Sequence, residues 1–327
     1  MANIKQVAQL ARLSVSCVSK YLKEPKSVRP YSREQIESAI NELHYVPSTI
    51  ARNLRTQRTG IIKIISMSIT NQFFAEFFET IRTELEKNHY LGSLQTIQHH
   101  EDKRFQIRDF EQIDGVILCF IENQNTLNSI CQTIPTHLPI INIHGIKSVN
   151  EFTTILTDLQ RGAFDASEHL ISRGSTHIAY IGGSSDSTIS NIKRMGFLAA
   201  LKNHSENIQY VCSQNHTYSM QSGFDAAREL FEKDSTIDAI FCENDLLAAG
   251  AIHYLCDSNK RVPEDVRVIG YDNIPLASMF IPSVSSVSIP IQEISALSVS
   301  ALLDHLEKKE AKDVYIKPTL VIRKSTQ

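Results

Sequence analysis

The sequence predicts a small helical head followed by a larger α/β body with enough strands for two parallel sheets. Three observations support this fold class. The chain has 327 residues, a length typical of about two domains with a small extra module. Apolar residues recur at helical spacing in the first 45 residues. From residue 61 onward, continuous apolar segments alternate with helical patterns.

Composition excludes several classes of protein. Hydrophobic residues make up 42% and charged residues 21% of the chain, which is typical of globular proteins and excludes disordered and coiled-coil chains. No uninterrupted apolar run of ~18 residues occurs, so we expect no membrane partner. The N-terminus lacks the apolar run of a secretory signal. Six cysteines without a CxxC pair indicate buried, reduced thiols, and we expect a cytoplasmic protein.

Charge is distributed unevenly along the chain. Residues 1–59 carry ten basic and four acidic side chains, a net charge of +6, whereas the rest of the chain carries −9. A basic head on an acidic body indicates a polyanionic partner such as nucleic acid. A merely solvated basic surface is the alternative.

Three short helices are predicted in the head. The first spans 4–11, and Ser14 is a candidate N-cap of the second. Ser32 and Gln35 form a capping-box pattern at the start of the third. Two short helices joined by about three residues and covered by a third predict a helix-turn-helix. A generic three-helix bundle is the alternative, and the charge bias favours the DNA-binding motif.

The second helix of this motif enters the major groove of DNA. Serine can bond base edges or phosphates, lysine can donate to guanine, and an apolar side chain can touch a thymine methyl. We therefore expect a DNA-binding surface that includes Arg29 and the outward residues of the second helix, which are Val15, Ser16, Ser19 and Lys20.

A further short helix is predicted after Pro47, with Ser48 as its cap. It would have only about seven residues, too few to be stable alone, so it should fold against a second copy of the chain or against DNA. Its apolar edge includes Ala51 and Leu54 and is flanked by arginines such as Arg55. Apolar wedges beside arginines suit insertion into the minor groove. An ordinary flexible linker is the alternative.

In the body, apolar segments alternate with helical stretches, which predicts parallel sheets covered on both faces. Strands are expected over 61–69, 91–97, 114–121, 139–144, 177–183, 210–215, 238–244 and 266–272. Helices are expected over 73–87, 161–174, 222–233 and 244–259. Ligands of such sheets bind beyond the carboxyl ends of the strands, so a cleft between two sheets would combine loops from both.

Aromatic, Asn/Asp and arginine side chains follow the predicted strands. Such side chains suit a small, neutral, hydroxyl-rich ligand, because rings pack on its C–H faces and polar groups bind its hydroxyls. Individually, a pair of phenylalanines is usually core and an Asp after a strand is usually a helix cap. The candidate effector residues at strand ends are Phe73, Phe74, Arg194, Tyr218, Asn244 and Asp272.

Motifs of catalysis and cofactor binding are absent. The sequence contains no GxxxxGK[ST], GxGxxG, HExxH or GxSxG pattern. The twelve histidines are scattered and indicate no metal site. We therefore expect no enzyme activity, no cofactor and no metal.

The sequence resembles the bacterial LacI/GalR transcription regulators over essentially its whole length. The head resembles that family in NIKQVAQLARLSVSCVSKYLK, and HYVPSTIARNLRTQRTG resembles its hinge helix. In the body the matching segments, in order, are TDLQRGAFDASEHLISRGSTHIAYIGG, KRMGFLAAL, AIFCENDLLAAGAIHYL and RVPEDVRVIGYDNIPLASMFIPSVSSV.

The resemblance implies a helix-turn-helix domain over 1–46, a hinge helix and linker over 47–59, and a periplasmic-binding-protein-like core over 60–327. The core would have an N-subdomain (about 60–157 and 290–315) and a C-subdomain (about 158–287 and 318–327). A homodimer would bind double-stranded operator DNA, with a small effector controlling its affinity. Base-reading positions correspond to Val15, Ser16 and Lys20, the minor-groove wedge to Leu54, and the clearest effector positions to Arg194 and Asp272.

Several positions depart from the family pattern. Arg12 occupies a turn position that is usually Gly or Asn, and Ser175 replaces a common His. A frequent acidic effector contact corresponds here to His144 or Asn142. We interpret the chain as a repressor of carbohydrate-utilisation genes that responds to a sugar. The alternatives are a purine- or nucleoside-responsive regulator of the same family, or a solute-binding protein without a DNA function.

Overall fold

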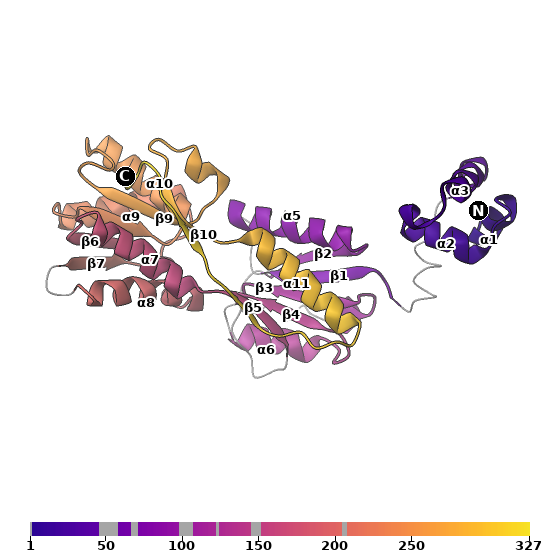
Figure 1. Cartoon of the computed structure of the whole chain (residues 1–327). Coiled ribbons are helices and arrows are strands. Elements are labelled where there is room, and N and C mark those ends of the chain that lie inside the picture. The colour runs from indigo at the N-terminus through magenta and orange to yellow at the C-terminus, as the bar shows by residue number, and fades with distance from the viewer. Residues whose placement is uncertain are drawn as a thin grey trace. The chain divides into compact units, whose positions relative to one another are not determined.

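The computed structural model describes residues 2–45, 58–66, 71–97, 107–121, 124–144, 152–204 and 208–327. The chain divides into two compact units, Met1–Thr59 and Gly60–Gln327. Figure 1 shows the elements of each unit along the chain. The helix predicted over residues 48–54 lies outside the described residues.

The head contains the three helices that the sequence predicts. They are α1 (Ile4–Leu10), α2 (Val15–Lys23) and α3 (Pro30–Glu42), with a 3₁₀ turn, η1 (Pro25–Ser27), between the last two. A small apolar core, which includes fully buried Val7, Val18 and Ile36, holds them together. These residues are spaced so that each helix turns its apolar stripe toward the other two.

The helix caps of the head differ in part from the prediction. Ser14 caps α2, because its side chain accepts a hydrogen bond from the Cys17 N–H at 3.2 Å, as predicted. The capping box predicted at Ser32 is wrong. Helix α3 begins two residues earlier, at Pro30, whose fixed φ suits the first helical position. Arg12 has φ 53°, so the turn between α1 and α2 places a non-glycine residue in the left-handed region.

The first sheet of the core is entirely parallel, with the strand order β11-β5-β4-β3-β1-β2. Side chains alternate between its faces, so Ile62, Ile64 and Ile117 pack on one face, and Ile65, Val116 and Leu118 on the other. Helices α5 and α11 cover the former face and α6 the latter (Figure 1). The bounds are β1 (Ile61–Ser66), α5 (Gln72–Lys87), β2 (Leu91–Thr96), η2 (Ile107–Phe110), β3 (Gly115–Cys119), α6 (Gln124–Thr133), β4 (Ile140–Ile143), β5 (Thr153–Thr157), α11 (Ile291–Leu306) and β11 (Val314–Ile316).

The second sheet has the order β12-β10-β9-β8-β6-β7 and is parallel except for β12, which is antiparallel to β10. Helix α7 packs against α8, and α9 against α10. The two pairs lie on opposite faces of the sheet (Figure 1). The bounds are α7 (Leu159–Ser172), β6 (His177–Ile181), α8 (Thr188–Lys202), β7 (Gln209–Ser213), α9 (Met220–Lys233), β8 (Ala239–Cys242), α10 (Asp245–Asp257), β9 (Arg267–Asp272), η3 (Pro275–Ser278), β10 (Ser285–Ser288) and β12 (Thr319–Val321).

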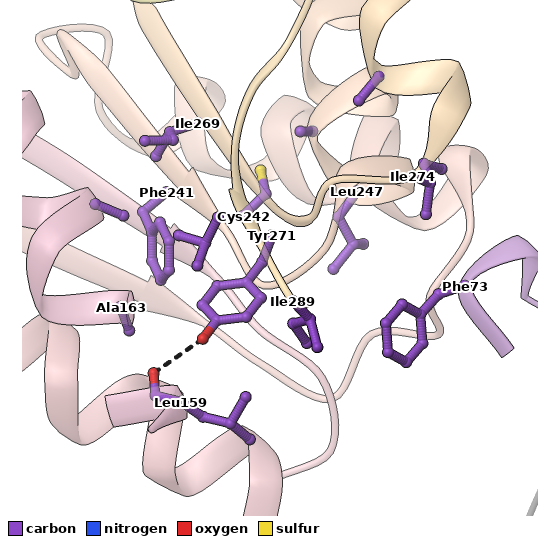
Figure 2. Packing of buried hydrophobic residues seen from close by; sticks show 14 of the residues in the cluster. Phe73, Leu159, Ala163, Phe241, Cys242, Leu247, Ile269, Tyr271, Ile274 and Ile289 are labelled. Atoms are coloured by element: carbon purple, nitrogen blue, oxygen red, sulfur yellow. Dashed lines mark hydrogen bonds between the residues drawn. The ribbon is translucent and has the colours of Figure 1, made fainter. Parts of the chain in front are cut away.

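The chain passes between the two sheets three times. It leaves the first sheet after β5, returns after β10 into α11, and passes again from β11 to β12. Next to the first passage, the buried Tyr271 hydroxyl donates a hydrogen bond to the Leu159 carbonyl at 3.1 Å (Figure 2). Each sheet is therefore assembled from segments far apart in the sequence.

The part of the chain that the structure describes contains all eight predicted strands and four that were not predicted: β5, β10, β11 and β12. Six thiols are free, but Cys256 is exposed, contrary to the expectation of buried cysteines. None of the helices that the structure describes is long and apolar enough to cross a membrane.

Candidate functional site

A cavity of about 50 Å³ lies where the carboxyl ends of strands from both sheets meet. Six of the seven predicted effector residues line it. The exception among the predicted residues is Arg194. The complete lining is Asn71, Phe73, Phe74, Phe120, His144, Leu159, Ile189, Lys193, Tyr218, Asn244, Asp272 and Ile289.

One wall of the cavity is aromatic and belongs to the first sheet. Phe73 and Phe74 lie in the first turn of α5, and Phe120 directly follows β3. The ring centroids of Phe74 and Phe120 are 5.0 Å apart in an edge-to-face arrangement, and those of Phe73 and Phe120 are 5.8 Å apart. Figure 2 shows Phe73 extending from its helix toward Ile289, another lining residue. This wall can pack against the C–H face of a ring-shaped ligand.

His144 extends the aromatic wall and is held in one orientation. Its ring stacks on Phe120 with 5.3 Å between centroids, and its Nε2 lies 3.0 Å from the Thr157 hydroxyl. Burial, together with the positive charge of Lys193, lowers the pKa of His144 to about 3. The ring is therefore neutral at neutral pH, and it offers hydrogen-bonding atoms rather than a charge.

The opposite wall is polar and belongs to the second sheet. Asn244 caps α10, because its side-chain oxygen accepts from the Leu247 N–H at 2.8 Å. This arrangement leaves the amide NH₂ group as the donor that can face the cavity. Tyr218 approaches Gly183 so closely that a Cβ on the glycine would lie 2.4 Å from the tyrosine hydroxyl oxygen. Asp272 ends β9 and is only 9% exposed.

Lys193, not Arg194, supplies the cation of the cavity. Its Nζ donates to the Glu243 carbonyl oxygen at 3.0 Å and lies 3.6 Å from Asp272 Oδ1 and 4.0 Å from the centroid of the Tyr271 ring. The sequence predicted Arg194, the next residue along the helix, for this place. Consecutive helical residues point about 100° apart, so only one of the two side chains can face the cavity. Arg194 is half-buried instead near Tyr180 and Cys212, away from the cavity lining.

Buried carboxyl groups surround this lysine. Burial raises the pKa of Glu243, Asp245 and Asp272, and Lys193 opposes that increase for Glu243 and Asp272. Glu243 also accepts a hydrogen bond from the Ser190 hydroxyl at 2.8 Å. The cluster places one lysine between carboxyl groups that would otherwise be costly to ionise.

Three residues of the site have a left-handed backbone. Phe120 and His144 directly follow strands and Asp272 ends one; all three line the cavity and have positive φ values of 58°, 49° and 92°. A non-glycine residue in the left-handed region costs about 1–2 kcal/mol. Strained backbone that the surrounding structure maintains is typical of functional sites.

Six lining residues were not predicted. Asn71 caps α5 by accepting a hydrogen bond from the Phe73 N–H at 3.0 Å. An Asn directly before an apolar helix is a sequence signal for such a cap. Phe120 lies within the strand predicted over 114–121, whereas β3 ends one residue before it. Lys193 is adjacent to the predicted Arg194, and the sequence alone does not show which of the two faces the cavity. The others are apolar residues that carry no such signal: Leu159, Ile189 and Ile289.

The structure describes five of the nine predicted DNA-binding residues, and four of these five are exposed. Val15, Ser16 and Lys20 on α2 are exposed, and Ser19 is half-buried. The Ser16 hydroxyl lies 2.8 Å from that of Ser14, within the first turn of the helix. Exposed Arg29 precedes α3. The remaining predicted contacts lie outside the described residues: Ser48, Ala51, Leu54 and Arg55.

Among the described residues, no group of three or more His, Cys, Asp and Glu side chains is placed to hold a metal ion. The cavity lining instead combines rings, amides, one carboxyl group and one ammonium group. Such a set can bind and orient a polar ring-shaped molecule by stacking and hydrogen bonding.

Comparison with known proteins agrees with this architecture. Residues 3–48 match the family described as bacterial regulatory proteins, lacI family, and residues 167–326 match the periplasmic binding protein-like domain. The ribose operon repressor of Escherichia coli (strain K12) is 30% identical over 311 residues, which cover 94% of this chain and 93% of that protein. The transcriptional repressor PurR of Erwinia tasmaniensis is 29% identical over 331 residues, covering 99% and 97%.

A solved structure extends the similarity to the complete fold. The complex of the transcriptional regulator CelR with cellobiose superposes with a TM-score of 0.73 at 25% identity, covering 99% of this chain and 100% of that one. The resemblance noted in the sequence is therefore confirmed. The chain belongs to the lacI family of bacterial regulatory proteins.

Proposed function

We propose that the protein is a sequence-specific repressor of carbohydrate-utilisation genes, and that a small sugar in the core cavity controls its affinity for an operator. The observation that carries this proposal is the cavity, in which an aromatic wall faces a wall of polar side chains, in a chain whose other unit is a helix-turn-helix. The protein would act in the cytoplasm as a regulator and not as an enzyme, and as a homodimer, because paired heads read two half-sites.

On the DNA side, the proposal assigns base reading to the exposed face of α2. Lys20→Ala is expected to weaken binding to the preferred operator by about 1–3 kcal/mol if the lysine donates to a guanine. Gel-shift titration of the operator and of a random duplex measures both affinities, and Lys26→Ala, an exposed lysine of η1, serves as the control. Equal weakening on both duplexes would assign Lys20 to a phosphate instead.

On the effector side, the lining favours a neutral polyol. Asn244, Asp272 and Lys193 offer hydrogen-bond donors and acceptors, while Phe74 and Phe120 offer ring faces. The named ligands of similar proteins point the same way, with a ribose operon repressor and a cellobiose complex among them. Isothermal calorimetry with a panel of mono- and disaccharides should yield one sugar that binds in the micromolar range. Purine bases, the alternative suggested by the similarity to PurR, should show no heat of binding.

The size of the cavity indicates how binding could be coupled to DNA affinity. At about 50 Å³ it is far smaller than the ~300 Å³ of an ordinary small-ligand pocket. A sugar would therefore fit better if the walls from the two sheets moved apart. The effector would then bind a more open arrangement of the core more tightly than the closed one. This difference in affinity would shift the protein toward the open arrangement.

A further inference from the structure

The core unit begins at a glycine with a specialised backbone conformation. Gly60 has φ 75°, and a Cβ at this position would meet no atom within 4 Å. Conformation rather than space therefore requires the glycine. The covalent connection between the two units passes through the Thr59–Gly60 peptide, so this residue sets the direction in which the chain leaves the core.

A buried carboxyl group holds this glycine. The Gly60 N–H donates to Asp114 Oδ2 at 2.8 Å, and the Gly60 carbonyl oxygen accepts from the Leu91 N–H at 2.8 Å. The Asp114 N–H in turn donates to the Ile61 carbonyl oxygen at 2.8 Å. Asp114 is 7% exposed and Gly60 is half-buried, so the bond between them is partly shielded from competing water. Both polar groups of the Gly60 backbone are thus fixed at the amino-terminal end of β1.

The strands that begin at this anchor lead to the effector cavity. Asp114 directly precedes β3, which is followed by Phe120 in the cavity lining. Strand β1 begins directly after Gly60 and pairs with β3 in register along its length. The anchor and the cavity therefore lie at opposite ends of the same two hydrogen-bonded strands.

The second sheet contains a counterpart of this anchor. Asp238 directly precedes β8, and its carboxyl oxygens accept from the Thr176 N–H at 2.7 Å and the His177 N–H at 3.1 Å, at the start of β6. Strands β6 and β8 are parallel neighbours, as β1 and β3 are. The second sheet thus has the same kind of contact, but the chain does not continue from it to the head. Asp238, although half-buried rather than buried, therefore provides a control for the contact itself.

We propose that Asp114 is a positioning residue for DNA binding: by holding Gly60 it fixes the direction in which the linker leaves the core. Without the carboxyl group, the Gly60 N–H loses its partner and the chain on the head side gains rotational freedom. Both heads of a dimer must be presented at a defined separation to bind an operator. Loosening the anchor therefore weakens operator binding specifically and leaves the electrostatic attraction to any duplex unchanged.

The test compares Asp114→Ala and Asp238→Ala in the full-length protein. The probe is a duplex selected by the unmodified protein from a random library, and a scrambled duplex measures non-specific binding. Asp114→Ala should weaken binding to the selected duplex about tenfold and leave the scrambled duplex unaffected. Asp238→Ala should bind the selected duplex as tightly as the unmodified protein does, even if it lowers the melting temperature as much as Asp114→Ala does. Failure of the unmodified protein to select any duplex would refute the DNA-binding function itself, a separate outcome.

Two further variants keep the proposal testable if Asp114→Ala does not fold. Asp114→Asn retains an oxygen that can accept from Gly60, so its operator affinity should lie closer to that of the unmodified protein. Gly60→Ala keeps the carboxyl group but opposes the positive φ, so it should weaken operator binding. The proposal is overturned if Gly60→Ala and Asp114→Ala bind the selected duplex normally, or if Asp238→Ala weakens that binding as much as Asp114→Ala at equal stability.

Discussion

Replacing Lys193 with methionine is expected to abolish the response to effector, whereas Arg194→Met is expected to leave it intact. Methionine keeps most of the length of the lysine side chain but removes its charge, which lies 3.6 Å from Asp272 Oδ1. Arg194 does not line the cavity, so its loss leaves the lining unchanged. Calorimetric titration of both variants with the sugar that binds the unmodified protein measures the effect. Normal binding by Lys193→Met would remove the lysine from the site.

The same substitution changes how stability depends on pH. Breaking a buried ion pair costs about 3–5 kcal/mol, because Asp272 and Glu243 then lose the neighbouring positive charge. Both carboxyl groups already have raised pKa values, and without Lys193 these pKa values rise further.

When folding raises the pKa of a carboxyl group, the folded state favours the protonated form of that group. This contribution to stability is complete below the pKa that the group has in the unfolded chain. It is lost as the pH rises through the pKa that the group has in the folded protein. The loss of melting temperature in Lys193→Met should therefore be small near pH 4.5, slightly above the ordinary carboxyl pKa of about 4, and large at pH 8. Thermal unfolding of the variant and the unmodified protein at both pH values tests this. An equal loss at both would show that packing, and not charge, is what the lysine contributes.

Leu54→Ala is expected to weaken operator binding about tenfold or more and to leave effector binding by the core unchanged. The resemblance to the family predicts that Leu54 is the wedge that enters the minor groove, and a methyl group is too small to separate a base step. Leu54→Met, which keeps a large apolar side chain, is the matched control. Gel shifts with the preferred operator, together with calorimetry of the effector, measure the two properties separately. An operator affinity unaffected in Leu54→Ala would refute the wedge.

The predictable part of the fold followed from local patterns. Strands such as β3 and β8 are continuous apolar segments, so their burial could be predicted from residue type alone. Strand β10 was missed because three of its four residues are serines. Ser285 and Ser286 are nevertheless fully buried, since their hydroxyls pair with Thr326 and Asp245. Polar residues that are buried by pairing with distant parts of the chain leave no local signal.

The candidate site was also predictable only in part. Phe73, Tyr218, Asn244 and Asp272 could be found because strand ends in parallel sheets gather ligand-binding residues. The lysine was missed because the rotation of α8 about its axis was unknown. That rotation is set by Gly196, where a Cβ would lie 2.1 Å from the Gln160 carbonyl oxygen on α7.

With Gly196 against α7, the geometry of the helix decides which side chain reaches the cavity. Lys193 lies about 60° around the helix from the glycine, whereas Arg194 lies about 160° away. By itself the sequence determined the two units, eight strands of the core and the family, because these depend on residue type and spacing. Only the tertiary structure decided that strands such as β10 are buried, which cation lines the cavity and that a buried carboxyl group anchors Gly60. All three depend on contacts between residues distant in the chain.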